Sequence, residues 1–167
     1  GSVAAKAGTT LHVKKLTSTG EATLTSKDEA KLDDVTAGTL AAESTAGSVN
    51  AGTLTAKTGN ASVTAKTDVK IDALKAEAGS TTVKATEGKL DVRTLNAKSL
   101  TAKAGTTLSA TTLDVKEHAE LTSGGDMTLD NASADTLTAK AGTTLDATKI
   151  HTAGDAGLAS GSDMILH

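Results

Sequence analysis

The octapeptide LTAKAGTT occurs twice in this chain, at residues 100–107 and, letter for letter, at residues 137–144. A close copy, VAAKAGTT, lies at residues 3–10. Looser copies are LTAKTGNA at 54–61, LKAEAGST at 74–81, LTSGGDMT at 121–128 and LASGSDMI at 158–165. A short unit that recurs along a whole chain is typical of solenoid proteins, in which each repeat packs only against its neighbours.

Two further markers give the length of the repeat. A short element with an apolar centre appears as KLD, KID, TLD or KIH, with centres at Leu32, Ile71, Leu90, Leu113 and Ile150. Glycines in the expected corners are Gly59, Gly79, Gly105, Gly125, Gly142 and Gly161. Both series fit one or two turns of about 20 residues, within the range of known β-solenoid and leucine-rich repeats.

Within one turn the apolar residues alternate with polar ones. Leu100, Ala102, Leu108, Ala110, Leu113 and Val115 are expected to face inward, and Thr101, Lys103, Thr107, Ser109, Thr112 and Asp114 outward. A period of two predicts strands, and the flanking glycines predict bends. Strands that stack on their equivalents in the next turn pair in parallel, and parallel crossovers are right-handed by default. The pattern therefore predicts an all-β, right-handed parallel β-helix of about eight turns.

The composition agrees with a thin, regular interior. The chain has no Phe, Tyr, Trp, Pro or Cys, so Leu, Val, Ile and Ala must fill the core. Proline would remove a donor from the strand ladder. Glycine is expected to supply corner conformations with positive φ. A helical solenoid is disfavoured because Thr and Gly are abundant and no apolar 3–4 spacing is sustained.

Charge and hydropathy exclude several classes of partner. The net charge is −3, acidic and basic residues are interspersed, and Arg93 is the single arginine. Nucleic-acid binders cluster their cations and add stacking aromatics, so no nucleic-acid partner is predicted. No apolar run approaches the 18 or so residues that span a bilayer. Gly1-Ser2 resembles a cloning scar, and residues 3–167 are interpreted as one solenoid segment of a longer filament without a signal peptide.

The turns LTAKAGTT, GSTTVKA and SGGDMTLDN resemble the repeat region of filamentous haemagglutinin-type exoproteins, across nearly the whole chain. That family comprises adhesins and contact-dependent inhibition toxins exported by two-partner secretion. The resemblance implies a right-handed β-helical filament on the bacterial surface, with an outer-membrane transporter as its partner during secretion. The family's secretion domain carries Asn-Pro motifs, and this chain has no Pro, so that domain is not expected here. No catalytic residue of the family carries over.

Several residues could in principle bind a metal, but each is better explained as part of a solvent-exposed corner. The four histidines, His12, His118, His151 and His167, share no turn and no spacing such as HExxH. Glu117, His118 and Glu120 are close in sequence, but one strand and its loop rarely form a site alone. Gly124-Gly125-Asp126 and Gly161-Ser162-Asp163 weakly resemble calcium-binding nonapeptides without their tandem pattern, and turn chemistry explains them better. No metal or cofactor is predicted.

Two other patterns suggest activities that the residues do not support. Asp33-Asp34 is the only adjacent acidic pair, and β-helical polysaccharide enzymes use paired carboxylates across a cleft, usually lined with aromatics. Thr-Leu-Thr occurs at 23–25, 53–55 and 136–138, which would suggest ice binding if it recurred once per turn. It does not, so outward threonine as a strand former is the preferred interpretation. No catalytic residue is predicted.

The hypothesis from sequence is a non-enzymatic structural shaft of a secreted, cell-surface adhesin or toxin-delivery filament. Its partners would be the neighbouring repeats of its own chain, and it would project a distal functional domain. The alternative is a binding module whose outer face engages a host glycan or receptor. A third and weaker alternative is a polysaccharide-active enzyme.

Overall fold

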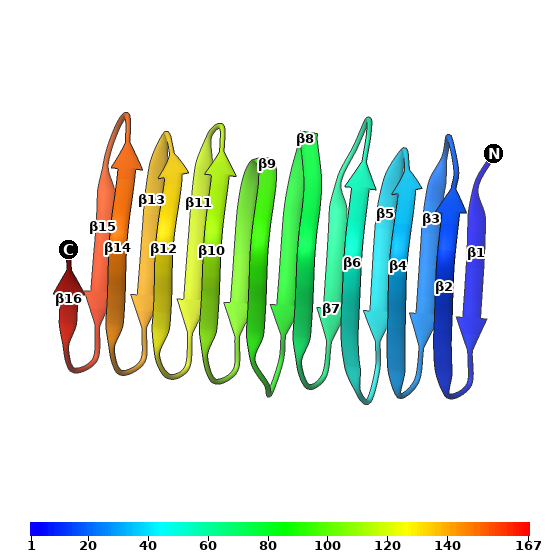
Figure 1. Ribbon diagram of the computed structural model, residues 1–167, viewed down its shortest axis with the longest axis horizontal. Helices are drawn as coiled ribbons and strands as arrows, with labels where there is room; N and C mark the ends of the chain where they lie inside the picture. The colour runs from blue at the N-terminus through cyan, green and yellow to red at the C-terminus, as the bar shows by residue number, and fades with distance from the viewer.

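The computed structural model describes all 167 residues, and every regular element in it is a β-strand (Figure 1). The strands are β1 (Val3–Ala7), β2 (Thr10–Thr17), β3 (Glu21–Ser26), β4 (Glu29–Ala37), β5 (Thr39–Ser44), β6 (Ser48–Ala56), β7 (Ala61–Ala65), β8 (Val69–Ala85), β9 (Leu90–Ala104), β10 (Leu108–Val115), β11 (His118–Ser123), β12 (Met127–Ala134), β13 (Thr136–Ala141), β14 (Leu145–Thr152), β15 (Ala156–Ser160) and β16 (Met164–Leu166).

All strand pairs are parallel, and each strand pairs with its equivalent in the next coil. Aligned residues lie about 19 positions apart, as Val3 and Ala22 do. The extremes are 18 residues between Leu90 and Leu108 and 21 between Val69 and Leu90. In Figure 1 the chain rises along the nearer strands, descends behind them and advances toward its C-terminus, which is a right-handed winding.

Nine coils result. Coil 1 is β1 and β2, coil 2 is β3 and β4, and coil 3 is β5 and β6. The long strands β8 and β9 each pass through two coils: coil 4 is β7 and the first part of β8, coil 5 is the rest of β8 and the first part of β9, and coil 6 is the rest of β9 and β10. Coil 7 is β11 and β12, coil 8 is β13 and β14, and coil 9 is β15 and β16. The predicted right-handed parallel β-helix is thus confirmed, with nine coils of about 19 residues where about eight of 20 were expected. At the spacing of paired strands the rod is about 40 Å long.

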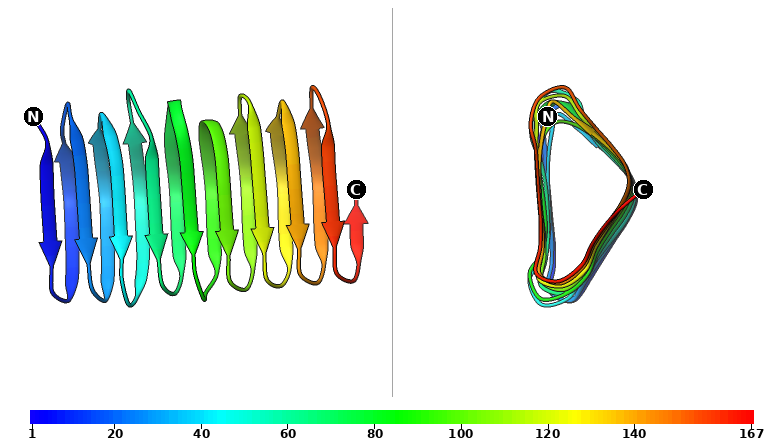
Figure 2. Two further views of the ribbon diagram at one scale, coloured as in Figure 1. Left: turned by 180° about the vertical axis from the view of Figure 1, so that it is seen from behind. Right: turned by 90° about the vertical axis from the view of Figure 1, so that its left-hand side faces the viewer.

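Each coil has three sides, which give the triangular outline seen down the axis in Figure 2. In coil 2, β3 forms the first side, and β4 bends at its middle to form the second and third. The bend falls where two successive residues, Asp33 and Asp34, both point away from the core between the buried Leu32 and Val35. No glycine or proline marks this bend in β4, so the repeat motif alone did not reveal a third side.

The core is one column of apolar side chains that runs through the coils. It contains 43 buried residues, all of them Leu, Val, Ile, Met or Ala. Leu108 is 1% exposed and Leu145 is fully buried, whereas Lys103 and Lys140 are exposed. All six residues expected to face inward in coil 6 are buried and none of the six expected to face outward is, which confirms the predicted strand faces.

The corner glycines act in a different way from the one expected. No glycine in the structure has a positive φ, so the expectation from sequence was wrong. The corners instead stack so closely that a side chain would collide with the coil before it. A Cβ on Gly142 would lie 1.9 Å from the carbonyl oxygen of Gly124, and one on Gly161 would lie 2.1 Å from that of Gly142. Glycine is required there because backbone approaches backbone.

Candidate functional surfaces

The histidines are distributed along the rod and do not meet. Nε2 of His12 lies 3.3 Å from Oδ2 of Asp33, and Nε2 of His167 lies 3.4 Å from Oδ1 of Asp146. Nδ1 of His118 lies 2.8 Å from the hydroxyl of Thr136. His151 is exposed on the outer surface of β14. Each of the three paired histidines thus contacts a residue of an adjacent coil.

The acidic residues near His118 do not converge on it. Glu117 pairs with Lys98 at 3.5 Å, and Glu120 projects from the outer face of β11, two residues beyond His118. No group of three or more His, Cys, Asp or Glu side chains in the structure has a geometry that could hold a metal ion.

Asp126 accepts hydrogen bonds from the equivalent corner of the next coil. One of its carboxylate oxygens accepts hydrogen bonds from the Thr143 hydroxyl and from the backbone N–H of Thr144, the latter at 3.1 Å. Because both donors favour the charged form, they lower the pKa of Asp126 below its ordinary value. Asp126 of the Gly-Gly-Asp motif therefore links its own corner to the corner of the next coil.

Two other side chains also accept a backbone N–H of the next coil, at positions where the strand ladder is interrupted. Oδ1 of Asp68 accepts the N–H of Lys89 at 2.7 Å, and Oδ1 of Asn60 accepts the N–H of Ser80 at 2.9 Å. In each case a short polar residue just before a strand binds the aligned residue of the next coil. These caps were not found from sequence, although Asp or Asn one residue before an apolar strand position is the signal that marks them.

Asp33 and Asp34 have separate partners. They lie on the bend of β4, where Asp33 contacts His12 and Asp34 lies 4.0 Å from the ammonium of Lys15. Each carboxylate contacts a side chain of coil 1, Asp33 the imidazole of His12 and Asp34 the ammonium of Lys15. No cleft lies between them, so the arrangement that glycoside hydrolysis requires is not present at this pair.

The Thr-Leu-Thr segments occupy different sides and registers. The segment 23–25 lies on the first side in β3, and 53–55 lies at the bend and third side in β6. In β13, Thr138 aligns with the Thr101 column through Glu120, while Thr136 precedes the first inward position. No continuous Thr-x-Thr ladder forms, which agrees with the interpretation of these threonines as outward strand residues.

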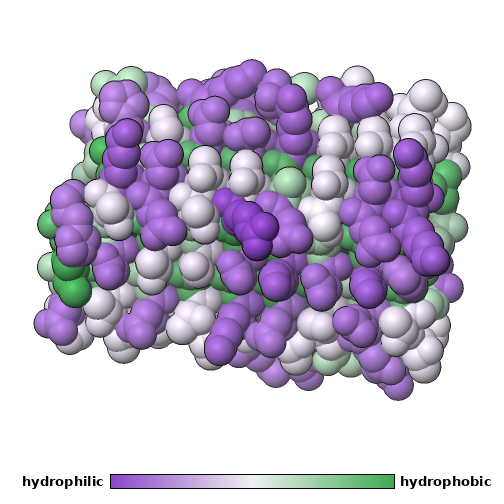
Figure 3. Space-filling view, viewed as in Figure 1, coloured by the Kyte–Doolittle hydropathy of each residue, from purple (hydrophilic) through white to green (hydrophobic).

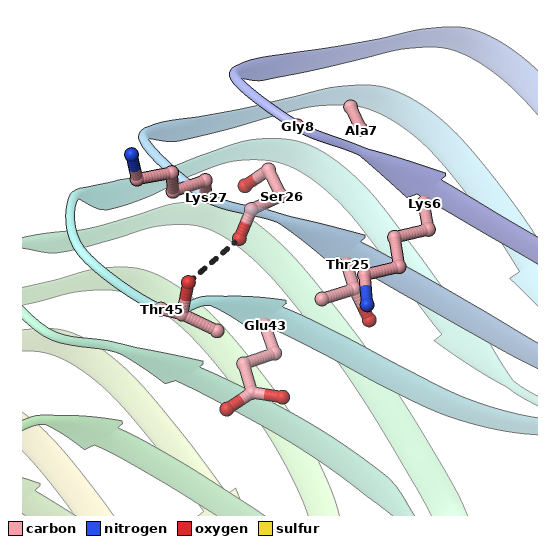
Figure 4. A pocket seen from close by; sticks show the side chains of 8 residues that line it. All are labelled: Lys6, Ala7, Gly8, Thr25, Ser26, Lys27, Glu43 and Thr45. Atoms are coloured by element: carbon pink, nitrogen blue, oxygen red, sulfur yellow. Dashed lines mark hydrogen bonds between the residues drawn. The ribbon is translucent and has the colours of Figure 1, made fainter.

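The largest hollow lies at the corner between the first and second sides of coils 1 to 3. Its volume is about 560 Å³, and it is lined by Lys6, Ala7, Gly8, Thr25, Ser26, Lys27, Glu43 and Thr45 (Figure 4). The Thr45 hydroxyl donates to the Ser26 carbonyl oxygen at 3.4 Å. In Figure 4, Lys6 extends toward Thr25 and Lys27 extends outward from the corner.

A second hollow of about 270 Å³ shares Glu43 and Thr45 with the first and continues to Lys66 and Glu87, whose charged groups are 3.8 Å apart. Together the hollows form a shallow polar groove with hydroxyl, ammonium and carboxylate groups. Such a groove offers hydrogen bonds to a polar ligand, but it contains no nucleophile paired with a base. Sequence reasoning missed it because its residues come from four strands and from the corners of five successive coils.

The two ends of the rod differ from its sides. The long face in Figure 3 is mostly polar, while apolar surface is visible at the left-hand end, where coil 9 lies. Met164, Ile165 and Leu166 are 41%, 42% and 57% exposed, and they are the only large apolar side chains of the structure with that degree of exposure. Within residues 1–167, β15 and β16 of coil 9 pair only with strands of coil 8.

These features define the chain as a repetitive β-solenoid. No protein-family model, no curated protein and no solved structure matches it. The structure contains no helix with the length and apolar character needed to span a membrane.

Proposed function

We propose that this chain is a structural shaft, a rigid spacer that holds a functional domain at a distance. The observation that carries the proposal is the single core cluster of 43 buried residues, which runs from Ala22 in coil 2 to Ala147 in coil 8. In such a rod each coil contacts only its neighbours, so length is gained by adding coils. The backbone is satisfied by 127 backbone hydrogen bonds, which favours stiffness along the axis.

The setting that we propose is the bacterial cell surface. It is supported by the resemblance of the repeats LTAKAGTT and SGGDMTLDN to filamentous haemagglutinin-type exoproteins. In this proposal the chain is secreted through an outer-membrane transporter and forms part of an adhesin or toxin-delivery filament. The regular outer surface, with charges in both signs and no paired catalytic groups, supports a mechanical role over an enzymatic one.

Rigidity and coil-wise length can be tested together. Lys6 and Ala159 occupy the same outward column on the first side, eight coil spacings apart. Spin labels on cysteines at these positions should give a narrow distance distribution near 38 Å, from a spacing of about 4.8 Å per coil. Deleting residues 100–136 removes two coils in register, because Leu100 aligns with Ala119 and Ala119 with Leu137. The distance should then fall to about 29 Å.

A broad distribution, or an unchanged distance after the deletion, would contradict the shaft. A deletion of half a coil, residues 119–127, serves as the control, since it places outward residues in the core and should prevent folding.

A second candidate function, binding of a host glycan through the side of the rod, is favoured by the polar groove at Lys6, Thr25 and Glu43. Hydroxyl and charged groups there are suited to sugar hydroxyls or carboxylates. A glycan array probed with the intact chain separates the two proposals. Binding that is lost in Lys6→Glu and retained in Lys140→Glu, an outward lysine on a distant coil, would favour the binding module over the shaft.

A further inference from the structure

The first side of the rod carries a column of lysines in coils 5 to 8. Lys84, Lys103 and Lys140 occupy the same outward position, with Thr122 between the last two. The first side is the long straight edge of the triangle in Figure 2, and it faces the viewer in the left view of that figure. Lys103 and Lys140 are the lysines of the two LTAKAGTT repeats. Winding thus places residues that are far apart in the sequence on one line along the axis.

The three lysines of this column have no acidic partner. Several lysines elsewhere do, as Lys66 pairs with Glu87 at 3.8 Å. The column lysines are exposed, and none of the ion pairs of the structure includes one of them. Their positive charge is therefore available to an external anion.

Lys84 and Lys103 are also direct neighbours of the same charge. At every other place where two aligned residues of paired strands are both Asp, Glu, Lys or Arg, the charges are opposite, as they are at Lys70 and Asp91. Like charges directly opposite each other on neighbouring strands are destabilising. The lysine column therefore departs from the charge pattern of the rod at a cost in stability, and functional positions are where such departures are expected.

The surface beside the lysine column is rich in hydroxyl groups. The adjacent outward column of the same coils consists of Thr82, Thr101, Glu120 and Thr138. The next column consists of Ser80, Ser99, His118 and Thr136. No apolar side chain faces outward on the first side of these four coils. The face therefore combines free ammonium groups with hydrogen-bonding groups of both kinds.

We propose that this face binds a linear polysaccharide with one carboxylate on each sugar, laid along the axis of the rod. The three charges lie one and two coils apart, at about 4.8 and 9.6 Å, and form a sparse line about 14 Å long. The ammonium groups donate charge-assisted hydrogen bonds to carboxylates, while the neighbouring hydroxyls donate to and accept from sugar hydroxyls. A sparse line of single charges fits one anionic group per sugar better than dense sulfation.

Two other kinds of polyanion fit this face less well. Single-stranded nucleic acids bind through bases stacked on aromatic side chains as well as through phosphates, and the chain has no aromatic residue. Binding to an anionic membrane surface usually includes apolar side chains that insert beside the cations, and none faces outward here. Both are used as competing probes in the test.

The decisive test removes the column from the full chain. In Lys84→Gln/Lys103→Gln/Lys140→Gln, the affinity for polygalacturonate should fall by at least about tenfold, because three surface charge contacts are lost. Isothermal titration calorimetry measures the affinity, and circular dichroism checks that the variant is folded. Binding by the wild-type chain should weaken as salt is added, since the contacts are exposed.

The matched control removes the same charge elsewhere. Lys31, Lys57 and Lys149 are exposed, form no ion pair and lie outside the column. Lys31→Gln/Lys57→Gln/Lys149→Gln should change the affinity by less than about twofold, since only the long-range charge is altered.

A gain of binding tests the geometry of the column. Thr122→Lys fills the gap between Lys103 and Lys140 and should tighten binding by about twofold to fivefold, the effect of one added surface charge contact. In the absence of polymer the added like charge should lower the melting temperature slightly. Thr111→Lys adds the same charge at the bend of β10 and should not tighten binding.

Several results would overturn the proposal. They are an equal loss of affinity in the two triple variants, no loss in the column variant, and equal affinity for methyl-esterified polygalacturonate, which lacks the charge. Tighter binding of dextran sulfate, single-stranded DNA or phosphatidylglycerol vesicles than of polygalacturonate would assign the face to another partner.

The proposal can fail separately from the two proposed functions. Lys6→Glu, which tests the polar groove, should leave the affinity for polygalacturonate unchanged, because Thr25, Glu43 and Thr64 separate Lys6 from Lys84 in the column. The distance measurement that tests the shaft does not depend on any ligand.

Discussion

Coils 1 and 8 begin with almost the same sequence, but coil 8 has a coil on both sides in this structure and coil 1 on one side only. Residues 3–11 read VAAKAGTTL, and residues 137–145 read LTAKAGTTL. In coil 8 the corner glycine is enclosed and Leu145 is completely buried. In coil 1 the corner glycine is open and Leu11 is only partly buried. A residue's contribution to this fold is therefore set by the coils on either side of it and not by its local sequence.

The largest expected effect is a charge placed in the enclosed copy. Leu145→Asp buries a carboxylate with no partner in a narrow core, and we expect it to cost several kcal/mol of unfolding free energy. Leu11→Asp in coil 1 should cost clearly less, since solvent reaches that position. Chemical denaturation measures both variants. Equal losses would mean that the end coil is as well covered as the interior.

Hydrogen exchange sharpens the same comparison. Because stability in a solenoid is nearly a sum over coils, the damage from Leu108→Asp should spread from coil 6 to the coils beside it before it reaches the ends. Uniform loss of protection along the rod would contradict coil-by-coil additivity.

The next largest loss of stability is expected where the corner glycines Gly124, Gly142 and Gly161 stack on one another. Gly142→Val forces a side chain toward a carbonyl oxygen that already lies 1.9 Å from the Cβ position, so the backbone of coil 8 must move. We expect a loss of about 1–3 kcal/mol or more. Gly8→Val should leave the melting temperature of the chain nearly unchanged, because nothing lies within 4 Å of the Cβ position of Gly8. If the glycines were needed for a positive φ, both variants would be strained alike.

A smaller effect concerns acid. The hydrogen bonds from Thr143 and Thr144 lower the pKa of Asp126 in the folded state. A depressed pKa adds stability above the unfolded-state pKa, and that stability is lost as the pH falls through the folded value. Asp126→Asn should therefore lower the melting temperature slightly at pH 7 and reduce its decline below about pH 4. Asp163→Asn removes no hydrogen bond of this structure and should change neither quantity.

The smallest effects are expected outside the core. Lys103→Ala and Lys140→Ala occupy equivalent exposed positions in coils 6 and 8, and each should change the unfolding free energy by within about 0.5 kcal/mol. Denaturation of the two variants beside Leu108→Asp gives the comparison. If Lys103→Ala were as damaging as Leu108→Asp, the assignment of inward and outward faces would be wrong in every coil.

Much of this architecture was predictable from sequence. Alternation of Leu100, Ala102 and Leu108 with polar residues predicted which side chains are buried, because a strand repeats every two residues. The recurrence of LTAKAGTT predicted the stack. The bend at Asp33 and Asp34 was not predicted, because it needs only two successive outward residues and no glycine or proline. The candidate groove was also missed, since it is assembled from residues of several coils.

The sequence by itself determined the strand class, the inward and outward faces and the approximate length of a coil, all of which follow from local periodicity. The tertiary structure alone decided why the corners contain glycine and which polar residues cap them. Those features depend on how near the next coil lies, at 1.9 Å from a Cβ position in one corner and open to solvent in another. Distances between coils arise only when the chain is wound, so no single repeat can encode them.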